Sequence, residues 1–279
     1  MLKEGIIKIL YFMQAVFSKG DGLCPYCQNS DYQIIYKKYR IIKICRCFNC
    51  GLFWTSPIFR CYKLYDFLYE GPGMTTVYPK NLEELKSSLF IATDKDFSYI
   101  FDLLKTVSVG KKILEFGSSW GYFLFAAKQR GFDAAGVEIS GRRRLFGKKR
   151  LGANSVSGLE SVFNDKEKFD AIVTLHTLEH LPSLRTIFEG FNRLLKNDGM
   201  LIIEVPFVEI DKGNSDAFKI MGAIHPLGFT PDFFINNLPK QGFAVSLYQI
   251  PQERCRENNG KMNRTIVLCK KERESELVK

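Results

Sequence analysis

Two acids and a glycine-containing turn have the spacing of a site for a nucleoside-bearing cofactor. Residues 115–121 read Glu-Phe-Gly-Ser-Ser-Trp-Gly, and a second acid, Glu138, closes the next apolar run. Glycines at the turn from a strand into a helix let the backbone approach a ligand, and the helix N-terminus offers unpaired N–H groups. An acid at the end of the following strand can accept hydrogen bonds from both hydroxyls of a ribose. The pattern therefore indicates a cofactor that carries a nucleoside.

Four cysteines have the spacing of a zinc site. Cys24 and Cys27 form one C-x-x-C pair, Cys47 and Cys50 form another, and 19 residues lie between the pairs. Two such pairs hold Zn²⁺ tetrahedrally, and a site closed by four thiolates supports structure rather than chemistry. Disulfides are the alternative, and Cys45 is a substitute ligand for Cys47. The spacing predicts a small N-terminal zinc ribbon, built on a hairpin that cannot bury a core without metal.

The three histidines are candidates for acid–base or metal chemistry. His176-Thr-Leu-Glu-His180 formally matches an inverted zinc-peptidase motif, but that motif needs both histidines on one helix, and here a strand ends just before it. The default for His180 is a residue at the entry of a helix that makes structural hydrogen bonds. His225 stands on a later loop, where a neutral imidazole could accept the proton of a substrate hydroxyl or simply anchor the loop.

Alternating apolar runs and helical patterns predict the elements that position these residues. Short runs rich in branched residues are typical of strands buried on both faces, and helical segments ending at Gly131, Gly199 and Gly242 separate them. The order predicts an α/β fold with a mostly parallel sheet and one antiparallel strand. The predicted strands of the sheet include residues 113–116, 134–137, 169–175, 200–205, 243–250 and 264–270.

Two blocks of the sequence resemble the class I S-adenosylmethionine-dependent methyltransferases. The E-x-G-x-x-x-G spacing from Glu115 to Gly121 resembles motif I of that family, which usually has a glycine where Ser119 stands. The segment from Phe169 to Gly199 resembles motif IV and the helix after it, with F-D-x-I, then L-E-H, then L-K-x-x-G. The resemblance implies a Rossmann-like fold with a seven-stranded sheet.

The same resemblance implies roles for individual residues. Glu138 would bind the ribose of S-adenosylmethionine, and His176 would form a wall of the cofactor or acceptor pocket. Some methyltransferases with E-x-x-E-H at this place are similar to this segment and hold a divalent metal, so a metal at His176, Glu179 and His180 is an alternative. His225 begins an H-x-x-x-F-T segment similar to one that overhangs the acceptor site in methyltransferases of bacterial polysaccharide clusters. The residues expected along the methionine side of the cofactor are Glu115, Gly117, Ser119 and Gly121.

Length and composition allow one large domain and one small one. The chain has 279 residues, of which 46% are hydrophobic. In the linker, Tyr69 and Tyr78 are candidates for contact with the cofactor or substrate, or they simply pack the linker. The expected parts are an N-terminal helix (1–20), the zinc ribbon (21–60), a linker with cap helices (61–110) and the S-adenosylmethionine-binding domain (111–279).

The N-terminal segment 6–17 resembles the apolar part of a signal peptide. Lys8 interrupts it, no small-residue cleavage site follows, and no run approaches the roughly 20 apolar residues of a membrane span. We expect a helix that packs on the protein, with a membrane-surface anchor as the alternative. The cysteine cluster favours a reducing compartment, so the expected location is the cytoplasm.

The net charge of +10 favours an anionic partner, and its densest run is residues 141–150, Gly-Arg-Arg-Arg-Leu-Phe-Gly-Lys-Lys-Arg. Such a run could bind the phosphates of RNA, of a nucleotide sugar or of a lipid headgroup, or it is a solvated helix face.

The expected function is methyl transfer from S-adenosylmethionine to a hydroxyl of a sugar or another small molecule. Ribbon-bearing chains of this plan resemble methyltransferases of bacterial sugar and polysaccharide clusters, and the long C-terminal domain of the sugar C-methyltransferases is not found among these residues. An RNA methyltransferase is one alternative, because some carry such a ribbon, although the N-P-P-(F/Y) motif is missing. A non-catalytic zinc-ribbon adaptor is another, which the intact Glu115 and Glu138 disfavour.

Overall fold

The computed structural model divides the chain into two compact units, which are described separately. Unit 1 comprises Met1–Tyr78, His176–Thr186 and Val205–Asn237, and unit 2 comprises Pro79–Leu175, Ile187–Glu204 and Leu238–Lys279. The residues that the structure describes are 2–18, 20–38, 40–59, 82–91, 95–107, 110–158, 168–208, 221–250 and 265–273, with only the backbone of residues 2–4.

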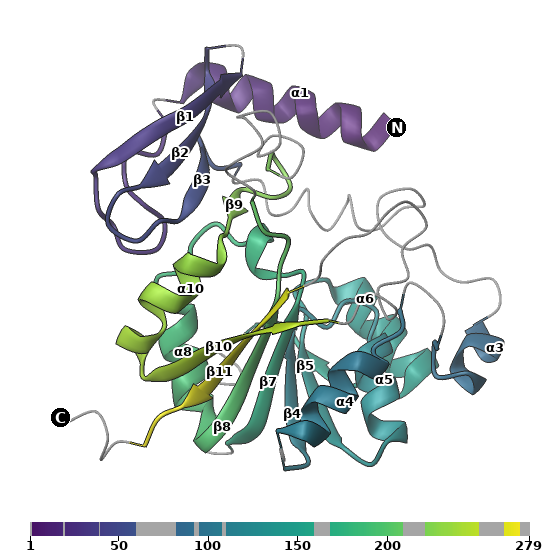
Figure 1. Ribbon diagram of the computed structural model, residues 1–279. Coiled ribbons are helices and arrows are strands. Elements are labelled where there is room, and N and C mark those ends of the chain that lie inside the picture. Colours follow the sequence, from purple (N-terminus) through teal and green to yellow (C-terminus); the bar gives the residue numbers. More distant parts are fainter. Residues whose placement is uncertain are drawn as a thin grey trace. The chain divides into compact units, whose positions relative to one another are not determined.

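Unit 2 is built on a seven-stranded sheet with the order β10-β11-β8-β7-β4-β5-β6 (Figure 1). Neighbours from β8 to β6 run parallel, and β11 is antiparallel to both β8 and β10. The predicted fold, a mostly parallel Rossmann-like sheet, is therefore confirmed. The strands are β4 (Lys112–Phe116), β5 (Asp133–Val137), β6 (Ser155–Val156), β7 (Phe169–Leu175), β8 (Leu195–Glu204), β10 (Phe243–Gln249) and β11 (Thr265–Lys271).

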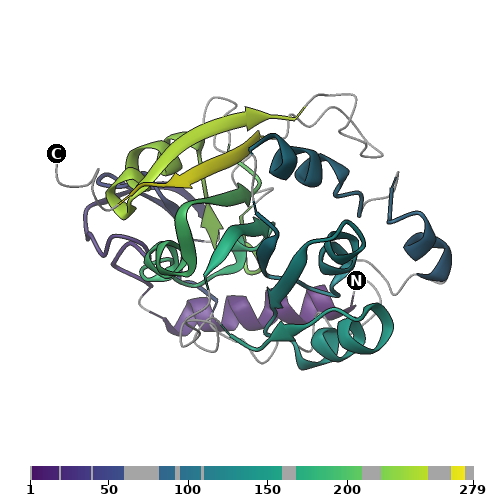
Figure 2. The ribbon, with the colours of Figure 1, turned by 90° about the horizontal axis from the view of Figure 1, so that it is seen from below.

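Helices cover both faces of this sheet (Figures 1 and 2). On one face, Phe101 of α4 stacks on Phe123 of α5 at 5.1 Å between ring centroids, in a core that includes Ile113. On the other face, Phe116 meets Phe191 of α8 at 5.2 Å. The helices of unit 2 are α3 (Leu82–Ser87), α4 (Ser98–Thr106), α5 (Tyr122–Gln129), α6 (Gly141–Phe146), the π-helix η1 (Gly147–Leu151), α8 (Ile187–Leu194) and the 3-10 helix η3 (Pro239–Gln241).

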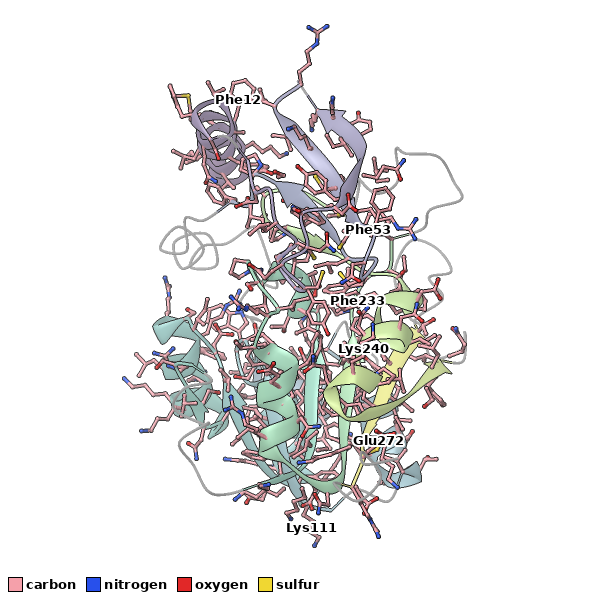
Figure 3. All side chains as sticks on the ribbon, turned by 90° about the vertical axis from the view of Figure 1, so that its left-hand side faces the viewer. Phe12, Phe53, Lys111, Phe233, Lys240 and Glu272 are labelled. Carbon is pink, nitrogen blue, oxygen red and sulfur yellow. The ribbon has the colours of Figure 1, made fainter. Side chains whose placement is uncertain are left out.

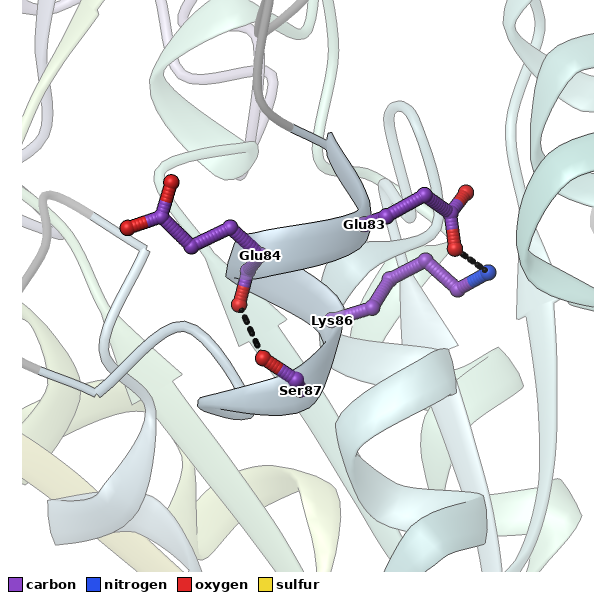
Figure 4. Close-up of polar contacts among 4 residues, drawn as sticks. All are labelled: Glu83, Glu84, Lys86 and Ser87. Carbon is purple, nitrogen blue, oxygen red and sulfur yellow. Dashed lines mark hydrogen bonds and ion pairs between the residues drawn. The ribbon is translucent and has the colours of Figure 1, made fainter.

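Two predictions from the sequence concern the ends of helices in unit 2. The helical segment predicted to close at Gly199 ends earlier, at Leu194, because Leu195 already pairs with Phe169 of β7. The sequence also predicts that Asn81 caps a helix together with Glu84, three residues later, but Asn81 lies outside the described residues. In helix α3, Lys86 pairs with Glu83 at 2.9 Å, and the Ser87 hydroxyl donates to the Glu84 carbonyl at 2.7 Å (Figure 4).

Unit 1 contains a four-stranded antiparallel sheet with the order β1-β2-β3-β9. Strand β9 comes from much later in the chain and pairs through Leu227 with Trp54 of β3, so the ribbon takes its fourth strand from outside residues 21–60. The predicted domain boundaries stay a prediction. The elements are α1 (Leu2–Phe17), β1 (Tyr32–Lys38), β2 (Ile42–Cys47), β3 (Phe53–Ser56), the 3-10 helix η2 (Leu178–His180), β9 (Leu227–Gly228) and α10 (Pro231–Asn237).

No helix in the described ranges is long and apolar enough to cross a membrane.

Candidate functional site

The glycine-containing turn joins β4 to α5 in unit 2, and every second residue from Gly117 to Gly121 has a left-handed backbone conformation. Gly117, Ser119 and Gly121 all have positive φ, at +88°, +48° and +87°. The N–H groups of Gly117 and Ser118 both donate to the carbonyl of Val137 at 2.9 Å, which ties the turn to the end of β5. The parallel strands β4 and β5 end here at the same edge of the sheet, where α/β folds bind their ligands.

Gly121 allows a close approach that a larger residue would block. It is the N-cap of α5, and a Cβ atom at this position would lie 2.7 Å from Cβ of Ala153. Both its positive φ and this contact require glycine. The turn is thus packed tightly against the segment that follows η1.

Glu138 is buried and held by two main-chain amides. Ser119 N–H donates to one carboxylate oxygen and Ser140 N–H donates to the other, each at 2.8 Å. A carboxylate has about four lone-pair positions, so each oxygen keeps acceptor capacity for a ligand hydroxyl. The two main-chain amides therefore fix the orientation of this carboxylate. The sequence did not identify Ser140 as a part of this site, because a main-chain donor leaves no trace in residue type.

Glu115 is a buried acid with an unsatisfied oxygen. Its Oε2 has no hydrogen-bond partner among the described residues. Burial raises the pKa of this carboxyl well above its usual value, and the nearby charge of Glu138 raises it further. A buried polar atom without a partner is costly, which points to a ligand or water that completes the site. The cationic methionine end of S-adenosylmethionine fits this requirement.

The basic run 141–150 divides into buried and exposed residues. Arg143 is buried with its guanidinium 5.4 Å from the centre of the Trp120 ring, and Arg144 donates to the carbonyls of Glu138 and Ile139. These two arginines thus support the structure around Glu138. The exposed cations of the run are Arg142, Lys148, Lys149 and Arg150.

A third acid, Glu204, lies at this edge of the sheet and was not predicted from the sequence. The carboxylate of Glu204, at the end of β8, is buried and accepts a hydrogen bond from the Tyr99 hydroxyl at 2.6 Å. An acid within the otherwise apolar run of residues 200–205 is the sequence signal that could have found it.

In unit 1, the four predicted metal ligands come together. Sγ of Cys24 lies 3.5 Å from Sγ of Cys50, Cys27 and Cys47 are equally close, and all four sulfurs lie within 4.8 Å of one another. Zn–S bonds of about 2.3 Å in a tetrahedron require sulfurs about 3.8 Å apart. The set therefore fits Zn²⁺, and Cys45 is not part of it.

The thiols and their turns have properties of a metal site. The hydrogen bond with Cys50 lowers the pKa of Cys24 to about 6, whereas the same bond raises that of Cys50. Four thiolates at this distance need a cation to neutralise them. Each pair sits on a tight turn, in which Gln28 N–H donates to the Cys24 carbonyl and Gly51 N–H donates to the Cys47 carbonyl.

A second cluster in unit 1 joins Glu179, His180 and His225. Each residue offers one atom that could bind a metal, and these three atoms lie within 4.8 Å of one another. The centroids of the two imidazole rings are 4.5 Å apart. Nδ1 of His180 lies 2.9 Å from the carbonyl of Ile224. Because a carbonyl only accepts, Nδ1 carries the proton in the neutral ring, and Nε2 is then the acceptor atom.

Glu179 is the buried acid of this cluster. Burial alone would raise its pKa, but the hydrogen bond with His176 and the charges of His180 and His176 outweigh burial, so the pKa is lowered. Its Oε1 lies 3.5 Å from Nδ1 of His176, and its Oε2 has no hydrogen-bond partner in the part of the chain described. Burial lowers the pKa of His180, which favours the neutral ring.

The zinc-peptidase interpretation does not agree with the local structure. The segment after His176 forms the three-residue 3-10 helix η2, so His176 and His180 do not share the face of an α-helix. His176 belongs to unit 1, and its role as a wall of the cofactor pocket stays a prediction. Tyr69 and Tyr78 lie outside the described residues.

The chain is similar to known methyltransferases. The family described as "Methyltransferase domain" matches residues 93–245. A ubiquinone biosynthesis O-methyltransferase of Glaesserella parasuis is 27% identical over 105 residues, which cover 34% of this chain and 44% of that protein. A probable fatty acid methyltransferase of Mycobacterium tuberculosis is 26% identical over 139 residues, covering 46% of this chain and 31% of that protein.

The chain thus spans less than half the length of these two relatives. Among solved structures, the YcgJ protein of Bacillus subtilis matches with a TM-score of 0.51 at 13% identity, over 64% of this chain and 100% of the other. At that identity the likeness concerns the fold alone.

Proposed function

The chain belongs to the methyltransferase domain family and carries a class I S-adenosylmethionine-dependent methyltransferase domain, and on this premise we propose that it methylates a hydroxyl group of a sugar or another small molecule. We infer a hydroxyl acceptor from the cluster of Glu179, His180 and His225, because an imidazole beside a carboxylate is suited to removing a hydroxyl proton.

The cofactor would lie over the glycine-containing turn of unit 2. S-adenosylmethionine supplies an electrophilic methyl group on a sulfonium. Glu138 accepts hydrogen bonds from the ribose hydroxyls, with its carboxylate already oriented by Ser119 and Ser140. Glu115 helps to hold the cationic methionine end, directly or through a water, and the main chain of Gly117 and Gly121 lies beside the ligand.

His225 is the proposed base for the acceptor hydroxyl. It accepts the proton as the hydroxyl oxygen attacks the methyl group, and the neutral His180 beside it holds the ring in place. Glu179 favours the positive charge that then develops on the imidazoles. His176, which lies close to Glu179, is proposed to line the cofactor or acceptor pocket. A divalent metal bound by His176, Glu179 and His180 is the alternative chemistry.

The ribbon is proposed to hold one Zn²⁺ on Cys24, Cys27, Cys47 and Cys50, as a structural ion. The fold would then require a compartment in which these thiols stay reduced, and the cytoplasm is the expected location.

An acceptor screen tests the proposed function. Zinc-loaded protein is incubated with S-adenosylmethionine labelled in its methyl group, together with nucleotide sugars, small phenols or short RNA. Label should move to a hydroxyl compound, and His225→Gln should lower the rate at saturating substrate by about 100-fold or more, while S-adenosylhomocysteine binding is retained. Transfer to RNA would overturn the small-molecule assignment, and a rate restored by Mg²⁺ would favour the metal chemistry. Cofactor binding without any transfer would favour the adaptor.

A further inference from the structure

Helix α1 of unit 1 is apolar on two sides, and only one of them is packed. The buried side contains Ile7, Tyr11 and Ala15, which form a cluster with Ile42 and Phe59. Two hydrogen bonds fix the rotation of α1 about its axis. The Tyr11 hydroxyl donates to the Pro57 carbonyl at 2.8 Å, and the Gln14 amide donates to the Ile58 carbonyl at 2.7 Å. The helix therefore has one defined outward side.

That outward side is almost entirely apolar. Phe17 is 81% exposed and Ile9 is 64% exposed, values that are unusual for large apolar side chains that recur on one face of a helix. Phe12 lies at the margin of this face, at the outer edge of unit 1 (Figure 3). The spacing of three and four residues places the members on one side of the helix. The outward face consists of Ile6, Ile9, Leu10, Met13, Val16 and Phe17.

Cations accompany this face. Lys8 is exposed on α1 itself, and the turn between β1 and β2 packs on the α1 cluster through Ile41. The residues around Ile41 include Lys38, Arg40 and Lys43 and no acid. Over residues 1–59, eight lysines and arginines stand against three acids. An apolar helix face with an exposed lysine on the same helix, and further cations on the turn that packs against that helix, complements a surface that is apolar below and negatively charged above.

We propose that the outward face of α1 binds the surface of a lipid bilayer that contains anionic headgroups. The helix lies parallel to the membrane plane, with Ile9, Met13 and Phe17 inserted at the boundary between headgroups and acyl chains. Lys8 and the cations of the β1–β2 turn contact the phosphates. The buried side of α1 keeps its contacts with the ribbon, so binding needs no rearrangement of unit 1. The methyltransferase would then act at the surface of a membrane.

Vesicle sedimentation tests the proposal on the full zinc-loaded chain. We expect the protein to sediment with vesicles of phosphatidylcholine and phosphatidylglycerol and to bind pure phosphatidylcholine less. Replacing Ile9→Glu and Met13→Glu together should lower the partition coefficient at least ~10-fold, because two apolar side chains lose their burial. The matched control is Ile235→Glu, an isoleucine that is 42% exposed on helix α10 and should leave partitioning unchanged.

Two further measurements distinguish lipid binding by this face from misfolding of the variant and from self-association of the chain. Zinc content and S-adenosylhomocysteine affinity of the double variant should equal those of the wild type, which shows that both units remain folded and that cofactor binding is independent of the lipid contact. Sedimentation velocity without lipid should give the same species for both proteins. A wild-type dimer that the double variant dissociates would show that the face binds a second copy and would overturn the proposal. Absence of binding to anionic vesicles would overturn it as well.

Discussion

The main-chain N–H of Ser119 donates a 2.8 Å hydrogen bond to the carboxylate of Glu138, although the two residues belong to different loops of the sheet edge. Ser119 can aim its N–H in this direction because its φ is +48°, in the left-handed region. The geometry of the turn therefore helps to orient Glu138, the acid that we propose binds the ribose. Glycine adopts this left-handed conformation more readily than serine, in agreement with the glycine that the motif I resemblance leads us to expect at this position.

Ser119→Gly should leave the fold as stable as the wild type or stabilise it by up to ~1 kcal/mol. Relief of left-handed strain, worth about 1–2 kcal/mol, exceeds or offsets the entropy that glycine gains in the unfolded chain. Ser118→Gly is the matched comparison, because Ser118 lacks a positive φ and its hydroxyl lies 2.8 Å from that of Ser155. That variant should lose about 1 kcal/mol or more in urea unfolding. Equal losses in both variants would disprove the strain argument.

Gly121→Ala should destabilise unit 2 by about 2 kcal/mol or more, since the new Cβ atom would meet Ala153 at 2.7 Å and the backbone would be strained. Gly131→Ala is the control. Gly131 has a similar φ of +81°, but nothing lies within 4 Å of the position of its Cβ atom, so only strain of about 1 kcal/mol is expected. Thermal unfolding of the two variants isolates the effect of the contact.

Cys47→Ser should lose the bound zinc, and Cys45→Ser should keep it. Both cysteines are buried in β2, but only Cys47 belongs to the four-sulfur cluster. Metal analysis after gel filtration should give about one zinc per chain for the wild type and Cys45→Ser, and much less for Cys47→Ser. Zinc lost from Cys45→Ser and retained by Cys47→Ser would show that the ligand is assigned to the wrong cysteine.

Glu115 should make the cofactor-free protein less stable as the pH rises. Its folded-state pKa lies well above its usual value of 4.5, so between these two values the folded state holds a proton that the unfolded state has released. Stability therefore falls with pH in this window and reaches a plateau above the folded-state pKa. Urea unfolding from about pH 5 to about pH 8 should show a steeper decline for the wild type than for Glu115→Gln. Parallel curves would mean that Glu115 ionises normally.

The local parts of the site could be predicted from the sequence. Glu138 and the glycines of the turn are separated by one strand–helix–strand unit, whose periodicity is visible in the residues. The spacing of the four cysteines along the sequence likewise indicates the metal site. In both cases the site is made by neighbours in the chain, so residue type and distance along the sequence suffice.

Other features depend on contacts between distant segments and were not predicted. His180 meets His225, and β9 pairs with β3, only after the chain has folded. Arg143 looked like one of several solvated cations, but it is buried beside Trp120. A charge pattern does not reveal which member of a basic run turns inward, because that choice depends on the aromatic ring that receives it.

The most direct measurement is calorimetric titration of the zinc-loaded protein with S-adenosylhomocysteine, repeated on Glu138→Ala. Because both oxygens of Glu138 are oriented by main-chain amides at 2.8 Å, loss of the carboxylate should weaken binding at least ~100-fold, by about 3 kcal/mol. The control is Asp133→Ala, which removes an exposed acid at the opposite end of the same strand and should bind like the wild type. Binding that is absent in the wild type, or unchanged in Glu138→Ala, would contradict the assignment of the cofactor site.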